Sequence, residues 1–129
     1  MKKILLLLTI ISFVTFINGC ASNSNSSLPD KNACYEKGYA AFYTLEENGT
    51  LTSSNERYDR NSLTASHPIL PYNTKIKVTN LNNGRYVVLV INDHNMPEGD
   101  YIIKLSEKAA TELAASSDNE FSIDIIKWG

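Results

Sequence analysis

The residues of this 129-residue chain that could do chemistry gather where an apolar run ends. The stretch RYVVLVINDHNMPEGDY is apolar over residues 87–91, which predicts a buried strand, and continues with four polar residues, Asn92, Asp93, His94 and Asn95. A carboxyl group at the mouth of a buried strand loses part of its hydration, so we expect the pKa of Asp93 to be raised. Such a group can act as a general acid or base near neutral pH. Stabilisation of a turn by Asp93 explains the spacing equally well.

The other candidate side chains carry weaker signals. Glu56 lies in the polar loop TSSNERYD, where a solvated loop charge is the simpler interpretation. His67 and His94 are the only two histidines, and a lone histidine is more often structural or solvated than functional. The chain shows no carboxylates at metal-ligand spacing, no recognisable Ser-His-Asp order and no glycine loop for phosphate. We therefore expect no metal and no cofactor.

The N-terminus predicts export and a lipid anchor. Two lysines precede an apolar run over residues 4–17, which as a helix would rise about 21 Å, short of the roughly 30 Å of hydrocarbon in a bilayer. Residues 1–19 thus form a signal peptide. INGC resembles a bacterial lipobox and makes Cys20 the lipidation site; an ordinary signal peptide that ends near a cysteine is the alternative. We expect the protein on a membrane of the bacterial cell envelope, which in a Gram-negative cell is the outer membrane, facing the periplasm.

A polar linker leads to one domain. Residues 20–34, which include ASNSNSSLPDKNA, are too polar to bury a core and form a flexible tether. If Cys20 is lipidated, Cys34 is the only remaining thiol and no intramolecular disulfide is expected, which leaves a disulfide to another chain as the alternative. Residues 35–129 have a size that suits one hydrophobic core, and we expect a monomer. Without the two lysines of the signal peptide, ten basic residues face fourteen acidic ones, a net charge of −4, which argues against a nucleic-acid partner.

Strand patterns dominate the domain. Apolar or alternating runs predict strands over residues 38–43, 74–80, 87–91, 101–106 and 120–128, and the Asn82-Asn83-Gly84 turn joins the second and third as a hairpin. Residues 107–115 are rich in strong helix formers and follow Ser106, a good N-cap, so they predict a helix. Short strands with one helix suggest a small, mainly β barrel, although periodicity does not identify its type.

A longer stretch carries a family resemblance. The segment LTSSNERYDRNSLTASHPILPYNTKIKVTNLNNGRYVVLVIND resembles the rare lipoprotein A (RlpA) family of peptidoglycan lytic transglycosylases, and the match extends from GYAAFY to YIIKLSEKAATEL. The sequence motifs of that family are approximately T-A-S-G-E-x-Y-D, A-L-T-A-A-H-x-x-L-P-F-G-T, V-T-N-L-x-N-G-R and V-x-V-N-D-R-G-P. The motifs occur in the same order in this chain, and their spacing from Glu56 to Asp93 agrees without a gap. The resemblance implies a six-stranded double-psi β barrel.

The resemblance also implies an activity and a site. The activity is cleavage of the β-1,4 bond between N-acetylmuramic acid and N-acetylglucosamine in glycan strands that lack stem peptides, leaving 1,6-anhydro ends. Such cleavage serves cell-wall remodelling or daughter-cell separation. The family's catalytic glutamate, histidine and aspartate fall on Glu56, His67 and Asp93, and we expect Asp93 to act as acid and then as base. Substrate contacts are expected from Asn92, His94 and Tyr58.

The chain departs from the family pattern around this site. NDHNMP replaces NDRGP, so that His94 stands for an arginine and Asn95 for a glycine; Lys104 stands for an aspartate and Asn55 for a glycine. These changes support a second hypothesis, a catalytically impaired glycan-binding envelope lipoprotein. A third hypothesis, a structural lipoprotein, predicts protein contacts through Tyr39, Phe42, Tyr43 and Tyr86. Many family members carry a C-terminal SPOR domain; none occurs before Gly129, so we do not expect septal targeting by that route.

Overall fold

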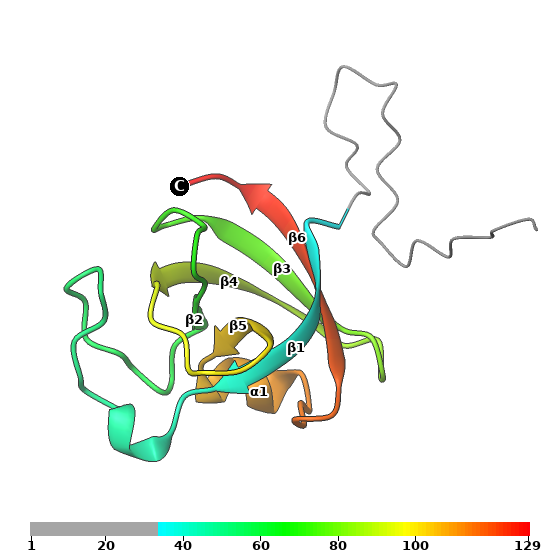
Figure 1. Ribbon diagram of the computed structural model, residues 1–129, viewed down its shortest axis with the longest axis horizontal. Coiled ribbons are helices and arrows are strands. Elements are labelled where there is room, and N and C mark those ends of the chain that lie inside the picture. The colour runs from blue at the N-terminus through cyan, green and yellow to red at the C-terminus, as the bar shows by residue number, and fades with distance from the viewer. Residues whose placement is uncertain (1–33) are drawn as a thin grey trace, which may run out of the picture.

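The computed structural model describes residues 34–129, so the predicted signal peptide, the lipidation of Cys20 and most of the linker lie outside the described residues. Within this range six strands form a closed barrel (Figure 1). The elements are β1 (Glu36–Phe42), the 3-10 helix η1 (Leu45–Glu47), β2 (Thr64–Ser66), β3 (Lys75–Asn80), β4 (Tyr86–Asp93), β5 (Tyr101–Leu105), α1 (Glu107–Glu112) and β6 (Glu120–Lys127). The prediction of a small, mainly β barrel with a short helix is confirmed.

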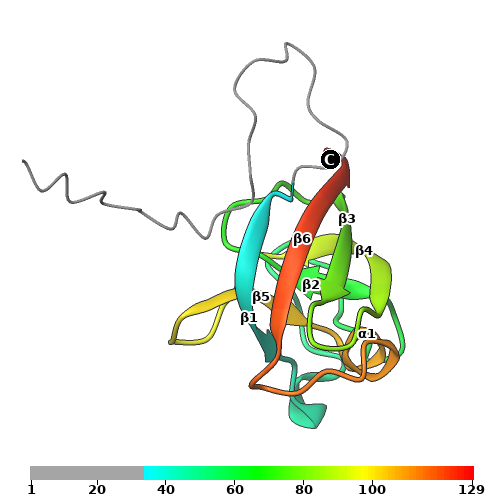
Figure 2. The same cartoon turned by 90° about the vertical axis from the view of Figure 1, so that its right-hand side faces the viewer.

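Around the barrel the strands follow the order β1-β5-β2-β4-β3-β6. β1 pairs with β5 and β2 pairs with β4 in parallel, whereas the other neighbours are antiparallel. Figure 2 shows β1, β6, β3 and β4 side by side as one wall of the barrel. The predicted hairpin is β3–β4, and its turn contains Gly84 at a φ of 77°, a conformation that glycine adopts without strain. Parallel pairing brings strand ends that are distant in sequence to the same end of the barrel.

Alternate strand positions fill the barrel interior. On β3, Ile76 and Val78 are buried, while the residues between them are less so. This period of two is why the run was recognisable as a half-buried strand. The buried apolar cluster comprises Ala40, Ala65, Leu70, Ile76, Val78, Val87, Leu89, Ile91, Ile103, Leu105, Ala109, Leu113, Phe121 and Ile123.

Helix α1 covers one end of the barrel, below the strands in Figure 1. Ser106 caps it as predicted, because the Ser106 hydroxyl accepts the Ala109 amide at 3.3 Å. Ala109 and Leu113 are fully buried and join the helix to the core. The helix ends at Glu112, earlier than the predicted end at residue 115, because Ala114 has a φ of 46° and leaves the helical conformation.

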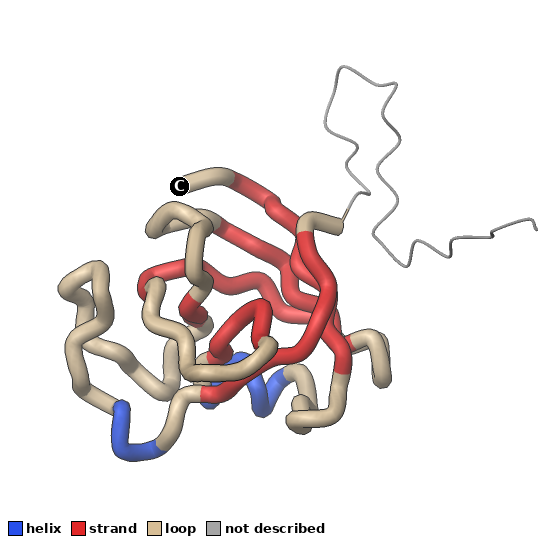
Figure 3. Tube along the Cα trace, viewed as in Figure 1, coloured by secondary structure: helices blue, strands red, loops and turns tan. Residues whose placement is uncertain are grey.

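A long loop connects β1 to β2. It contains η1 and an isolated bridge between Leu51 and Arg57, and Figure 3 shows it projecting from the strands. Strand β2 was not predicted because three residues are too few to show alternation; its pairing with β4 and β5 defines it. The loop returns to the barrel at the end of β4, where the Ser53 amide donates to the Asp93 carboxylate.

Cys34 is the first described residue and is disulfide-bonded, so it is not the lone thiol that the sequence predicts. None of the helices in residues 34–129 is long and apolar enough to cross a membrane.

Candidate active site

Asp93 ends strand β4 and is 3% exposed. The pairing of β2 with β4 shifts register just before Ser66, which lies opposite Asp93, so that Asn92 is an extra residue on β4. This bulge lets the consecutive residues Asn92 and Asp93 both be buried, whereas a regular strand alternates its faces. The backbone amide of His67 donates to the Asp93 carbonyl at 3.0 Å and holds the strand end in place.

Four donors surround the Asp93 carboxylate. Oδ2 accepts the Tyr43 hydroxyl at 2.6 Å. Oδ1 accepts the Ser53 amide at 3.1 Å, the Ser53 hydroxyl at 2.9 Å and the Asn95 amide at 3.2 Å. Burial raises the pKa of Asp93, but the hydrogen bonds together lower it by more, so the pKa lies below its usual value. The expected rise in pKa is therefore wrong: Asp93 is desolvated as predicted, but the donors outweigh that effect.

Tyr43 makes the shortest of these hydrogen bonds and is itself held in place. Burial, and then the contact with Asp93, raise the pKa of the Tyr43 hydroxyl, which therefore stays protonated. The Tyr43 ring stacks on Tyr58 with centroids 4.0 Å apart and planes at 11°. The Lys104 ammonium lies 4.1 Å from the ring centroid and forms an ion pair with Glu47. Lys104, which stands at a family aspartate position, thus orders Tyr43 through a cation–π contact.

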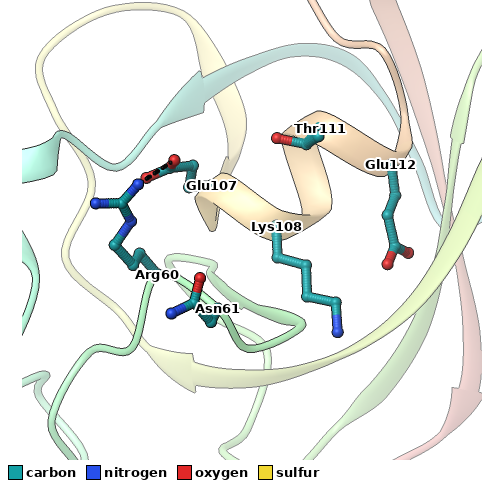
Figure 4. Close-up of a pocket in the computed structure, with 6 residues that line it drawn as sticks. All are labelled: Arg60, Asn61, Glu107, Lys108, Thr111 and Glu112. Atoms are coloured by element: carbon teal, nitrogen blue, oxygen red, sulfur yellow. Dashed lines mark hydrogen bonds and ion pairs between the residues drawn. The ribbon is translucent and has the colours of Figure 1, made fainter.

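Tyr58 lies inside the domain, although the sequence predicts that it binds substrate. It is 2% exposed, and its hydroxyl accepts the Glu107 amide at 3.1 Å. This placement favours support of the Tyr43 ring over direct contact with a sugar. Glu107 also lines a pocket of about 400 Å³, where it forms an ion pair with Arg60 at 2.8 Å. Figure 4 shows this pair and the other lining residues. The lining residues are Arg60, Asn61, Glu107, Lys108, Thr111 and Glu112, none of which is a predicted site residue.

His94 is fixed beside the site by three contacts. Its ring stacks on Tyr72 with centroids 4.2 Å apart and planes at 14°. Its Nε2 lies 2.7 Å from the Leu70 carbonyl, and because a carbonyl only accepts, Nε2 carries a proton. The His94 amide and the Tyr72 hydroxyl both donate to the Ser53 hydroxyl at 2.8 Å. Ser53 therefore connects Asp93 to the Tyr72 hydroxyl and to the backbone amide of His94.

Glu56 reaches the site through Asn92. It is exposed, and its Oε2 accepts the Asn92 side-chain amide at 3.2 Å. The buried Oδ1 of Asn92 has no hydrogen-bond partner among the described residues. Asn55 adopts a φ of 69°, a conformation that asparagine tolerates, so its replacement of glycine preserves the turn before Glu56. The structure thus brings Glu56, Asn92 and Asp93 together.

The ring of His67 has other partners. Its Nδ1 accepts the amides of Ile69 and Leu70 at 3.2 and 3.1 Å, and its Nε2 lies 2.8 Å from a Glu36 carboxylate oxygen. The ring is 1% exposed. Within residues 34–129 no hydrogen bond joins the His67 ring to Asp93 or Glu56. The hydrogen bond between His67 and Asp93 is made by the His67 backbone amide. Its catalytic role stays a prediction.

Three residues of the site were not predicted to take part in it: Tyr43, Ser53 and Tyr72. The available signal was slight, namely a tyrosine directly after a strand and a serine three positions before Glu56. The described part of the chain holds no group of three histidine, cysteine, aspartate or glutamate side chains placed to bind a metal ion. What the site offers is an ionised, buried carboxylate beside a protonated tyrosine and an exposed glutamate. This arrangement suits proton transfer to and from hydroxyl groups.

The lowered pKa of Asp93 predicts that the fold is sensitive to acid. The carboxyl titrates at its ordinary value of 3.8 in the unfolded chain and below that value when folded, so it stabilises the fold above 3.8 and ceases to do so as the pH falls through the folded value. We expect the free energy of unfolding, measured with urea, to fall as the pH drops below about 4, and to fall less in Asp93→Asn. Asp100→Asn, which removes an exposed carboxylate, is the control. The same pH slope in wild type and Asp93→Asn would contradict the expectation.

Comparison with known proteins places this site in a family. Residues 35–125 match the family described as Lytic transglycolase. The chain is 40% identical over 97 residues to "Endolytic peptidoglycan transglycosylase RlpA" of Escherichia coli O157:H7, a match that covers 75% of this chain and 27% of that protein. It is 42% identical over 91 residues to the protein of the same name in strain K12, covering 70% and 25% respectively. The relative of that name in Campylobacter jejuni is 40% identical over 94 residues, covering 71% and 34%.

The aligned part of this chain thus spans between a quarter and a third of the length of these relatives. Among solved structures, Streptomyces papain inhibitor (SPI) superposes with a TM-score of 0.50 at 20% identity, covering 70% of this chain and 96% of that one. At that identity the likeness concerns the barrel fold alone. The family match over residues 35–125 shows that this chain, a closed six-stranded barrel of the double-psi type, belongs to the lytic transglycolase family.

Proposed function

We propose that this domain is a lytic transglycosylase that cleaves peptidoglycan glycan strands. The observation that carries the proposal is the buried, ionised Asp93 at the end of β4, with the Tyr43 hydroxyl on one carboxylate oxygen and the Asn92–Glu56 pair alongside. Relatives named as endolytic peptidoglycan transglycosylases support this class of substrate. The bond cleaved is the β-1,4 linkage from N-acetylmuramic acid to N-acetylglucosamine in strands without stem peptides. The cellular role is cell-wall remodelling or daughter-cell separation.

The reaction needs an acid and a base but no water. O6 of N-acetylmuramic acid attacks C1, so the C1–O6 bond forms as the bond from C1 to the leaving O4 breaks. One proton leaves O6 and one arrives on O4. Asp93 is the group that moves both protons, and Glu56, on the exposed side, binds sugar hydroxyls. If protonation of O4 comes first, Asp93 must take up a proton when glycan binds, which the exclusion of water by the substrate favours because burial raises the pKa of a carboxyl group.

The proposal is tested by digestion of amidase-stripped glycan strands with the purified protein and mass spectrometry of the products. New 1,6-anhydro ends are the expected result. Hydrolytic products with reducing ends, or intact strands together with no binding, would overturn it. The alternative function is a catalytically impaired glycan-binding protein, and it is favoured by His94, whose ring is held by Tyr72 and Leu70 and does not offer the permanent forked cation of an arginine. Intact strands that co-sediment with the protein would select this alternative.

We also propose that Cys20 is lipidated and anchors a monomeric protein to the cell envelope, the outer membrane in a Gram-negative cell. The basic and apolar N-terminus and the INGC sequence support the anchor. Because the chain has two cysteines, a lipidated Cys20 excludes an intramolecular disulfide with Cys34. Mass spectrometry of the mature N-terminal peptide tells the two states apart: a diacylglyceryl mass on Cys20 supports the anchor, and a Cys20–Cys34 cross-linked peptide contradicts it.

A further inference from the structure

The two oxygens of the Asp93 carboxylate have different surroundings. Oδ1 accepts three hydrogen bonds, from the Ser53 amide, the Ser53 hydroxyl and the Asn95 amide. Oδ2 accepts one, from the Tyr43 hydroxyl. Backbone amides only donate, so two of the three groups on Oδ1 cannot receive a proton in return. The third group is the Ser53 hydroxyl, and whether it can accept a proton depends on its own hydrogen bonds.

The direction of the Ser53 hydroxyl follows from its neighbours. A hydroxyl has one hydrogen and two lone pairs. The His94 amide must donate to it, at 2.8 Å, and occupies one lone pair. An ionised carboxylate cannot donate, so the Ser53 hydrogen points to Asp93 at 2.9 Å and leaves Tyr72 to donate to the second lone pair at 2.8 Å. While Asp93 is ionised, both lone pairs of Ser53 are therefore occupied. A proton on Oδ1 would require the Ser53 and Tyr72 hydroxyls to rotate together and would face the two fixed amide donors of Ser53 and Asn95, a cost that Oδ2 does not carry.

We infer that Oδ2 is the oxygen of Asp93 that carries the transferable proton, and that Ser53, oriented by Tyr72 and His94, is the positioning residue that keeps Oδ1 an acceptor. The inference rests on the proposed role of Asp93 as acid and base. A phenol hydroxyl both donates and accepts, so Tyr43 can rotate to accept a proton on Oδ2. Protonated Asp93 thus places its hydrogen on the Tyr43 side, and the glycosidic oxygen of the substrate must approach Oδ2.

The nearby charged and titratable side chains connect to Asp93 indirectly, through other residues or through the backbone. Lys104 is paired with Glu47 and contacts the Tyr43 ring, and the His94 ring faces Tyr72 and the Leu70 carbonyl. Glu56 connects through Asn92, and His67 through its backbone amide. Replacement of Ser53 therefore changes the hydrogen bonds on Oδ1 and leaves these charges in place.

Ser53→Ala removes one charge-assisted donor, so we expect the pKa of the Asp93 carboxyl, followed by carbon-13 NMR without glycan, to rise by about one unit. Tyr72→Phe weakens the Ser53 donor without removing it and is expected to raise the pKa of Asp93 by roughly a few tenths of a unit. Ser53→Thr keeps the hydroxyl and should restore the wild-type value. Ser54→Ala is the matched control, because the Ser54 hydroxyl contacts Thr52 at 2.8 Å and not Asp93. A pKa in Ser53→Ala equal to that in Ser54→Ala would overturn the inference.

The assignment of the transferable proton to Oδ2 is tested separately in the Asp93→Asn variant. The side-chain amide group of that variant mimics a protonated carboxyl, so its NH₂ should lie toward Tyr43 and its carbonyl toward Ser53 and Asn95. Nuclear Overhauser effects from the NH₂ protons to the Tyr43 ring are expected; effects to the Ser53 and Asn95 amides instead would overturn the assignment of Oδ2.

Activity distinguishes this inference from the proposed function. If the domain is a transglycosylase, the limb of the kcat/KM pH profile that reports Asp93 moves upward in Ser53→Ala by the same amount as the carboxyl pKa. A raised pKa with no turnover in any variant, wild type included, supports the role of Ser53 and overturns the transglycosylase. Lower turnover in Ser53→Ala with an unchanged pKa and pH profile overturns the positioning role and leaves the proposed function standing.

Discussion

Asp93→Asn is expected to stop the formation of 1,6-anhydro ends, with turnover lowered by about 10²–10⁴-fold. The amide can neither protonate the leaving oxygen nor accept the proton of the C6 hydroxyl. The fold should persist, because the Asn carbonyl can accept the three donors that face Oδ1, and the Tyr43 hydroxyl can rotate to accept the new NH₂ group. The loss therefore reports proton transfer and not unfolding.

The measurement compares wild type, Asp93→Asn and Asp100→Asn on the same amidase-stripped strands, with mass spectrometry of the products and a thermal melt of each variant. Asp100 is an exposed carboxylate in the loop between β4 and β5, and its variant should keep wild-type turnover. Full turnover by a folded Asp93→Asn variant would show that another group moves the protons, and Glu56 would then be the next candidate. Co-sedimentation with glycan should be kept in Asp93→Asn, because the substitution leaves the rest of the surface unchanged.

Tyr58→Ala is expected to lower the free energy of unfolding by about 3–5 kcal/mol. Tyr58 is fully buried, stacks on Tyr43 and accepts a hydrogen bond from the Glu107 amide. Its truncation therefore leaves a cavity beside Tyr43, the residue that donates to Asp93. Tyr58→Phe keeps the stacked ring but leaves the Glu107 amide without its acceptor, which costs roughly 1–3 kcal/mol. Urea unfolding measures both values.

Tyr58→Phe also separates the two roles of this residue. Support of Tyr43 predicts a lower free energy of unfolding and a KM close to that of wild type. A substrate contact, as predicted from the sequence, requires a raised KM in addition to the lost stability. Tyr86→Ala is the matched control, because Tyr86 is 61% exposed and its removal is expected to change stability by less than about 1 kcal/mol.

The sequence by itself determined much of the fold. Alternation on β3 and the apolar run of β4 report which faces are buried, and Ser106 marks the start of α1, because each of these signals is local. The barrel type came from linked motifs, whereas only the structure shows that Glu56 contacts Asn92 next to Asp93. β2 was missed because its place depends on pairing with β4 and β5 and not on its own three residues.

The tertiary structure decided the electrostatics of the site. Tyr43 and Ser53 lie 50 and 40 positions from Asp93 in the chain, yet their hydrogen bonds turn the expected rise in its pKa into a fall. Ser53 and Tyr72 stand where the family pattern has alanine and phenylalanine, and only the folded chain shows that their hydroxyls join each other and the amide of His94. Local patterns predict which residues are buried, whereas the donors that surround a buried charge are set by contacts between distant segments.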